Sequence, residues 1–195
     1  MKFQMRSWPI STLEALAANK AVRVKAPGTL RILGLDPGLR NTGWGIIEVQ
    51  GNRLSFVADG VVKPDTTLSL AERLTAIFLE VQGIVAAYAP DESAIEESFV
   101  NKNPVSTLKL GHARAAAMLA PAVAGVSVAE YKPNLVKKSV VGAGHADKVQ
   151  VAAMMKILLP GSKATKDAAD ALAVAVCHAH HRTSVLNMVA KRNAG

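Results

Sequence analysis

The chain has 195 residues, of which 50% are hydrophobic and 19% are charged. This composition suits one domain with its own core and excludes a wholly disordered chain. The chain carries 23 Lys and Arg against 15 Asp and Glu, a formal net charge of +8, so the first partners to consider are polyanions: nucleic acid or an anionic membrane. Half of this excess lies in residues 1–30, which hold five basic residues and one acid.

Membrane insertion and secretion are not expected. The longest uncharged run, residues 115–129, is shorter than the roughly 20 residues of a spanning helix and is interrupted by Pro121 and Gly125. Residues 1–30 lack the compact apolar stretch of a secretory signal. The single cysteine, Cys177, excludes an internal disulfide and fits a reducing compartment. We therefore expect a cytoplasmic protein.

Residues 1–29 form no clear element with the rest of the chain. A short helix is predicted over residues 11–21, and Pro27-Gly28 then breaks the chain. We interpret residues 1–29 as a flexible N-terminal extension. Because basic residues dominate the segment, an arm that contacts DNA and an organelle-targeting peptide are the alternatives.

From residue 30 onward the hydrophobic pattern predicts three strands followed by a helix. The strands cover residues 30–36, 42–49 and 54–62, with Gly51-Asn52 as a hairpin signal between the second and the third. A helix follows, because apolar residues recur at spacings of three and four. It begins at residues 64–67 and ends near residues 88–90.

Helices and strands alternate in the second half of the chain. Strands are predicted over residues 93–97 and 126–130, with a helix from residue 103 to about residue 121 between them. Further helices are predicted over residues 133–141, 148–159 and 165–181. This order predicts one α/β domain with a mixed five-stranded sheet flanked by helices. We place the domain at residues 30–185, with residues 186–195 as a C-terminal tail.

Four acids occur where the surrounding pattern is apolar: Asp36, Glu96, Asp167 and Asp170. Asp36 ends the first predicted strand, and Glu96 lies in the fourth. Asp167 and Asp170 are three residues apart and share one face of the last helix. Three of the acids have a structural alternative, since Asp36 suits a turn, Glu96 an ion pair and Asp167 a helix N-terminus. Asp170 is harder to explain in this way, because its neighbours in the sequence are alanines and a leucine.

A cluster of carboxylates is costly unless a cation neutralises it. Hard oxygen ligands suit Mg²⁺ or Mn²⁺. Two such ions can activate a water and stabilise the leaving oxygen in phosphodiester cleavage. The sequence has no Cys and His set with zinc spacing and no phosphate-binding loop of the G-x-x-x-x-G-K-[ST] type.

Five sequence blocks, taken in order, resemble the family of RuvC-type Holliday junction resolvases. They are LGLDPG at residues 33–38 with TGWG at 42–45, AIE at 94–96 with Phe99, KLGHAR at 109–114, VK at 136–137 with VVG at 140–142, and DAADALA at 167–173. The match spans about residues 31–180. Residues 1–29 have no counterpart in typical members.

This resemblance implies a ribonuclease H-like fold and a homodimer that nicks four-way DNA junctions symmetrically in homologous recombination and DNA repair. It carries the metal-binding, catalytic role onto Asp36, Glu96, Asp167 and Asp170, with two Mg²⁺ per active site and Mn²⁺ as a substitute. Some members have His at the position of Asp167. A cytoplasmic bacterial enzyme and a branch-migration motor of the RuvA and RuvB type as a partner are further implications.

Basic residues before the last helix are candidates for DNA contacts. Lys132, Lys137, Lys138 and Lys148 lie within 17 positions and predict a phosphate-binding surface, with a solvated face as the alternative. Phe99 follows Glu96 by three residues, and the family stacks this position on bases opened at the junction. A core phenylalanine is the alternative for Phe99.

The helix that begins at residue 103 is rich in small residues, which permit close helix approach. We assign Leu108, Ala113 and Ala117 to a dimer interface, with core packing as the alternative explanation. A two-fold dimer would place two active sites on a two-fold-symmetric junction.

Two other classes of protein compete with a junction-resolving endonuclease. One is a catalytically silent junction-binding protein, against which the intact set of four acids argues. The other is an actin-like or sugar-kinase-like ATPase, because an Asp-x-Gly turn also opens its phosphate loop. That fold needs two related domains and a second glycine-rich loop, and the sequence has neither.

Overall fold

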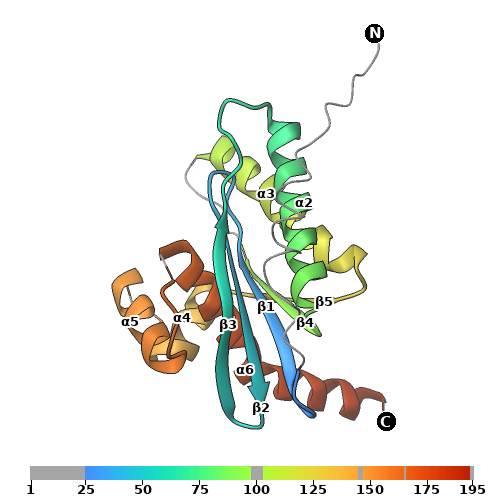
Figure 1. Cartoon of the computed structure of the whole chain (residues 1–195), viewed down its shortest axis with the longest axis vertical. Helices are drawn as coiled ribbons and strands as arrows, with labels where there is room; N and C mark the ends of the chain where they lie inside the picture. Colours follow the sequence, from blue (N-terminus) through green and yellow to red (C-terminus); the bar gives the residue numbers. More distant parts are fainter. Residues whose placement is uncertain (1–24, 98–102, 145–146, 165, 194–195) are drawn as a thin grey trace.

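A mixed sheet of five strands in the order β3-β2-β1-β4-β5 forms the centre of the molecule (Figure 1). The computed structural model describes residues 25–97, 103–144, 147–164 and 166–193, with only the backbone of Lys148 and of residues 183–193. The strands are β1 (Leu30–Asp36), β2 (Thr42–Gln50), β3 (Arg53–Val62), β4 (Glu92–Glu96) and β5 (Ser127–Tyr131). β2 pairs antiparallel with both β1 and β3, whereas β4 and β5 run parallel to β1. The predicted mixed five-stranded sheet is confirmed.

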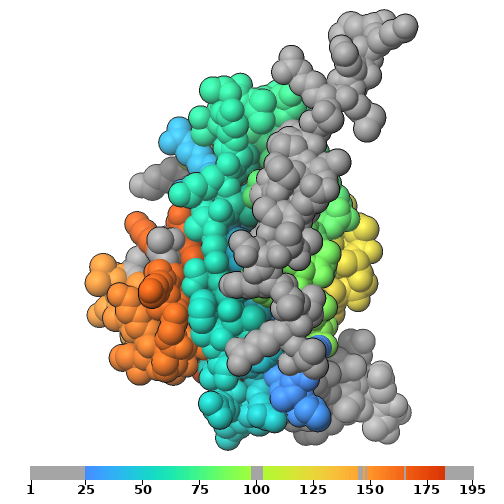
Figure 2. All heavy atoms as spheres, in the orientation of Figure 1, coloured from blue at the N-terminus to red at the C-terminus, as the bar shows by residue number. Residues whose placement is uncertain are grey.

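Helices cover both faces of this sheet. They are α2 (Leu70–Tyr88), α3 (Pro104–Val123), α4 (Pro133–Val141), α5 (Lys148–Leu158) and α6 (Lys166–Asn193). Successive strand residues point to opposite faces, so Leu33 and Leu35 pack with α2 and α3, while Ile32 packs with α4, α5 and α6. In the space-filling view, α4 and α5 form the orange lobe beside β3 (Figure 2), and Ser162, just after α5, donates a hydrogen bond to Asp59 of β3.

Two helix boundaries differ from the sequence prediction. Helix α2 begins at Leu70 instead of residues 64–67, because Ser69 and Glu72 form a capping box at its N-terminus. Asp65 forms a turn by accepting hydrogen bonds from the backbone and hydroxyl of Thr67. Helix α6 continues to Asn193, beyond the predicted end at residue 181. The predicted helix over residues 11–21 lies outside the described residues.

Helix α6 lies close to the sheet, because three glycines face it: Gly34 of β1, and Gly43 and Gly45 of β2. A Cβ atom added to Gly34 of β1 would lie 2.1 Å from the carbonyl oxygen of Ala171, and one added to Gly43 of β2 would lie 2.1 Å from that of Asp167. No side chain larger than a hydrogen atom fits at either position with α6 where it is. The glycines therefore set the position of the first turns of α6.

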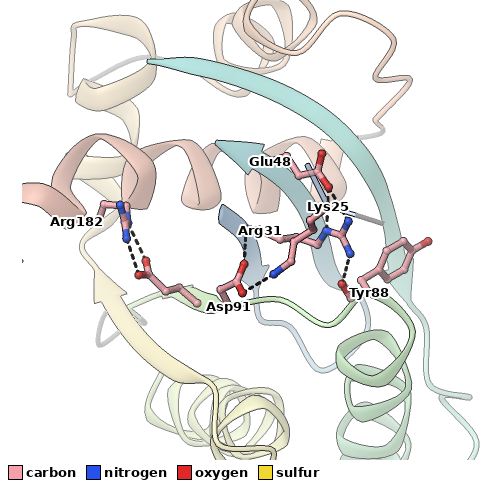
Figure 3. Close-up of polar contacts among 7 residues, drawn as sticks. Lys25, Arg31, Glu48, Tyr88, Asp91 and Arg182 are labelled. Atoms are coloured by element: carbon pink, nitrogen blue, oxygen red, sulfur yellow. Dashed lines mark hydrogen bonds and ion pairs between the residues drawn. The ribbon is translucent and has the colours of Figure 1, made fainter. Parts of the chain in front are cut away.

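At the other end of β1, ion pairs join the strands to their neighbours (Figure 3). Arg31, 1% exposed, donates hydrogen bonds to Glu48 over 2.6 and 3.2 Å and to the carbonyl of Tyr88. Asp91 accepts from the Arg31 backbone at 2.7 Å and from Lys25 at 2.5 Å. A buried arginine is tolerated here because its donors have partners.

Glu92, the first residue of β4, is the centre of a second network at this end. It accepts two hydrogen bonds from Arg182 of α6, at 2.8 and 3.0 Å (Figure 3). His178 Nε2 lies 2.8 Å from Glu92, and its Nδ1 lies 2.9 Å from the Tyr131 hydroxyl. Burial raises the pKa of Tyr131 to about 12, so the hydroxyl keeps its proton and donates a hydrogen bond to Nδ1 of His178.

Candidate active site

Two of the predicted acids end neighbouring parallel strands. Asp36 is the last residue of β1 and Glu96 the last of β4, and the register pairs Gly34 with Ala94 in the same two strands. Since alternate residues share a face, Asp36 lies on the face of Gly34, and Glu96 on that of Ala94. Both faces are covered by α6. The strand ends therefore direct both carboxylates toward this helix.

Helix α6 supplies the other two acids. Asp36 is opposite Gly43 in the β1–β2 ladder, and the missing side chain of Gly43 lets the backbone of Asp167 approach this point. Asp167 lies in the first turn of α6, where a negative charge also stabilises the helix. Asp170 follows on the same face, and both side chains are half-buried.

The four acids line two cavities that share Asp36. A cavity of about 160 Å³ is bounded by Asp36, Glu96 and Asp170 together with Lys137 of α4. A larger cavity of about 820 Å³ is bounded by Asp36 and Asp167. The fold thus brings acids from β1, β4 and α6, up to 134 positions apart in the sequence, to one region at the carboxyl edge of the parallel strands.

The donor set fits a hard divalent cation, because carboxylate oxygens are the ligands that Mg²⁺ and Mn²⁺ prefer. Within the described residues, no three His, Cys, Asp or Glu side chains lie close enough to hold a metal ion as they stand. Like charges repel, so carboxylates on the two sides of Asp36 need a cation between them to close together. Asp36 is central to such a site, since it lines both cavities.

Of the five predicted DNA-binding residues, the structure brings Lys137 to the acids. Lys137 is half-buried and lines the smaller cavity. Lys132, the N-cap residue of α4, and Lys138, in the last turn of α4, are exposed. Phe99 and the side chain of Lys148 lie outside the described residues, so their predicted roles stay predictions.

The assignment of Ala113 and Ala117 to a dimer interface is wrong. Both are 0% exposed and pack in the core against Ile77 and Val81 of α2, so a second copy cannot contact them. Their small side chains let α2 and α3 approach each other. Leu108 is 63% exposed, on a different face of α3.

Sequence reasoning missed the basic residues of the larger cavity. Arg40, Arg73 and Lys109 line it together with Asp36 and Asp167. Two of them had a signal, because Arg40 lies two residues after the Asp36-Pro37-Gly38 motif and Lys109 opens the KLGHAR block. Arg73 had none, since an arginine in the first turn of an amphipathic helix suggests only a solvated position.

Comparisons with known proteins agree on one family. The family model described as crossover junction endodeoxyribonuclease RuvC matches residues 32–178. Crossover junction endodeoxyribonuclease RuvC of Maricaulis maris (strain MCS10) is 66% identical over 154 residues, covering 79% of this chain and 93% of the relative. The same-named protein of Rhodopseudomonas palustris (strain BisA53) is 61% identical over 162 residues, covering 83% and 93%.

A solved structure supports the same relationship. The RuvC of T. thermophilus in complex with a Holliday junction substrate superposes with a TM-score of 0.73 at 32% sequence identity, covering 78% of this chain and 94% of that one. No helix among the described residues is long and apolar enough to cross a membrane. Fold and sequence therefore point to one group of DNA-cleaving proteins.

Proposed function

The chain belongs to the RuvC family of crossover junction endodeoxyribonucleases, and on this premise we propose that Asp36, Glu96, Asp167 and Asp170 are the residues that carry the reaction. The function is that of a Holliday junction resolvase, a metal-dependent nuclease of DNA recombination and repair. No comparison supports a catalytically silent junction-binding protein. The observation that carries the proposal is the shared position of Asp36, which lines both cavities.

The four acids would hold two Mg²⁺, with Mn²⁺ as a substitute. Bound divalent ions supply an activated water and neutralise charge on the leaving oxygen. The chain's own residues do the positioning: β1 and β4 fix Asp36 and Glu96 at adjacent strand ends, and the rigid first turns of α6 fix the other two acids. Lys137, in the smaller cavity, would stabilise the negative charge that develops on the phosphate.

The test is cleavage of a four-way junction by the full-length Asp36→Asn variant. Asn keeps the shape of Asp but has no charge, so we expect junction binding to persist and cleavage with Mg²⁺ to fall at least about 1,000-fold, as when a group that stabilises the transition state is removed. Asp65→Asn is the matched control, because Asp65 lies in an exposed turn. Cleavage by Asp36→Asn at the control rate would refute the assignment.

The active form is proposed to be a homodimer, because symmetric cleavage requires two active sites on a two-fold substrate. Its support is an exposed apolar stripe at helical spacing on α3, remote from the buried Ala113 face. The stripe consists of Val105, Leu108, Leu119 and Val123. Of the three interface residues predicted from the sequence, Leu108 alone belongs to this stripe.

Sedimentation of a charged variant tests the dimer. Leu119→Glu places a carboxylate in the stripe and is expected to give a monomer that no longer cuts both strands in one encounter. Val149→Glu is the control, since Val149 is 77% exposed on α5. Dimers of unchanged stability in Leu119→Glu would exclude this surface. A cytoplasmic location and a branch-migration motor of the RuvA and RuvB type as a partner stay predictions.

A further inference from the structure

The larger cavity, of about 820 Å³, shares Asp36 with the smaller cavity but is not lined by Lys137. Its walls come from three elements: the β1–β2 turn at residues 37–41, the start of α2 with Leu70 and Arg73, and the start of α3 with Ser106, Lys109 and Leu110. Asp36 and Asp167 close it at one end. It is too large for a metal ion alone, and most of its wall lies away from the carboxylates.

Three cationic side chains from three separate elements line this cavity. Arg40 comes from the turn, Arg73 from α2 and Lys109 from α3. Arg40 and Lys109 are exposed, and within the described part of the chain neither takes part in an ion pair. These three cations outnumber the two carboxylates, Asp36 and Asp167, that line the same cavity, so a further anion bound there would lower their mutual repulsion. The cavity therefore has the charge of an anion site.

One nitrogen of the Arg73 guanidinium holds the side chain in place, and another has no hydrogen-bond acceptor within the part of the chain that the structure describes. Its Nη2 donates to the carbonyl of Leu39 at 2.7 Å, which anchors the turn that carries Arg40. Its Nε is buried and has no hydrogen-bond partner among the described residues. A buried donor without a partner costs free energy, and an oxygen ligand in the cavity would satisfy it.

We propose that Arg40, Arg73 and Lys109 bind a phosphate of the cleaved DNA strand next to the scissile phosphate. The proposal rests on the proposed function, because it takes the scissile phosphate to lie at Asp36. The cleaved strand then runs from Lys137 in the smaller cavity, past the acids, into the larger cavity. Cations on both sides of the acids fix the strand along its length. Two fixed points orient the scissile bond better than one, which raises the rate of attack by a positioned water.

The experiment replaces single phosphates of the cleaved strand by uncharged methylphosphonates and measures junction binding without cleavage, in EDTA. Wild-type protein is expected to bind about tenfold more weakly when one phosphate adjacent to the scissile one is neutralised. Lys109→Gln and Arg40→Gln should bind the unmodified junction more weakly and be insensitive to that same methylphosphonate. The salt dependence of their affinity should also be less steep by about 0.7–0.9 for each phosphate that the variant no longer neutralises.

Arg53→Gln is the control, because Arg53 is an exposed cation on the β2–β3 hairpin. It should keep the sensitivity to the methylphosphonate. Arg73→Lys retains a charge but removes the second donor, so it should show a partial effect. If Lys109→Gln and Arg40→Gln remain as sensitive as wild type, the subsite is refuted. Wild-type cleavage of the unmodified junction with Mg²⁺, measured in parallel, tests the proposed function separately.

Discussion

Acidic residues lie at both ends of β1 and β4, and the two ends differ in their surroundings. At the amino ends, Glu48, Asp91 and Glu92 form ion pairs with Arg31, Lys25 and Arg182 (Figure 3). At the carboxyl ends, Asp36 and Glu96 line cavities together with acids of α6. The same two strands therefore have one end neutralised by the chain's own cations and one end that lines cavities.

The ion pairs at the amino ends serve the stability of the fold, whereas the acids at the carboxyl ends serve the proposed reaction. The Arg31 network joins the start of β1 to β2 and to the end of α2, so it holds the sheet and the α2 layer together. The acids at the carboxyl edge are positioned instead by strand ends and by the glycine contacts of α6. Substitutions at the amino ends should reduce stability, whereas substitutions at the carboxyl ends should reduce activity.

Gly43→Ala should reduce both stability and cleavage, and the two losses together should be the largest of the predicted effects. Its Cβ would lie 2.1 Å from the backbone oxygen of Asp167, so α6 must move. We expect unfolding free energy to fall by about 3 kcal/mol and cleavage to fall by about 100-fold, because the acids of α6 are displaced. Urea unfolding and single-turnover cleavage measure the two effects.

Gly111→Ala is the matched control for this substitution. A Cβ at Gly111 of α3 meets no atom within 4 Å, and alanine favours a helix over glycine by about 1 kcal/mol. The control should therefore be at least as stable as wild type and equally active. If Gly43→Ala behaved like Gly111→Ala, the glycine contact would not position the site.

Arg31→Met sharpens the comparison from the amino end. The substitution removes the hydrogen-bond donor to Oε1 of Glu48 and to the backbone carbonyl of Tyr88. Removing one partner of a buried ion pair costs about 3–5 kcal/mol, which urea unfolding would show. Cleavage per folded molecule should stay at the wild-type level. A specific fall in cleavage by the folded variant would contradict the division between the two ends.

Lys137→Gln is the corresponding change at the carboxyl end. Lys137 lines the cavity of Asp36, Glu96 and Asp170, and removal of a charged donor to phosphate should slow single-turnover cleavage roughly 10- to 100-fold. Unfolding free energy should change by no more than about 0.5 kcal/mol, as for most surface positions. Lys138→Gln, one residue away and exposed, should have a smaller effect on the rate.

The smallest expected effect is a dependence of stability on pH at the amino ends. Hydrogen bonds from Arg182, opposed by burial and aided by His178, lower the pKa of Glu92, and burial lowers the pKa of His178. Both folded pKa values lie below their unfolded values, so stability is full at neutral pH. It falls as the pH drops below the unfolded pKa of histidine, about 6.5, and again below that of glutamate, about 4.3.

His178→Gln checks the first of these two steps. Glutamine does not titrate, so the fall in unfolding free energy between pH 7 and the folded pKa of His178 should become shallower. Urea unfolding at a series of pH values measures it. An unchanged slope in this range would show that His178 does not contribute. His180→Gln is the control, because His180 is exposed.

The sequence predicted the five strands, their mixed sheet and the acid that ends the first strand, because apolar runs mark the strands and a charge after such a run is conspicuous. It did not predict where α2 starts, since the Pro-Asp-Thr-Thr signal at residues 64–67 hid the capping box at Ser69. It also could not tell which apolar face of α3 is buried. The alanine face packs against α2, while the stripe with Leu108 is exposed.

Long-range contacts explain the remaining misses. Arg31 stands in a buried strand pattern, and its partner Glu48 lies 17 positions away across a hairpin, so the buried ion pair is visible only in the fold. The close approach of Gly43 to Asp167 joins residues 124 positions apart. Arg73 reaches the larger cavity only because α2 and α3 begin beside the β1–β2 turn.

The central claim is that the acids at the carboxyl ends of β1 and β4 collect divalent metal for cleavage. The most direct measurement counts bound Mn²⁺ by electron paramagnetic resonance in complexes with a four-way junction whose scissile phosphates are methylphosphonates. We predict two Mn²⁺ per active site for wild type and for Arg31→Met, and no such binding in Asp36→Asn. Equal Mn²⁺ binding by Asp36→Asn and wild type would contradict the claim.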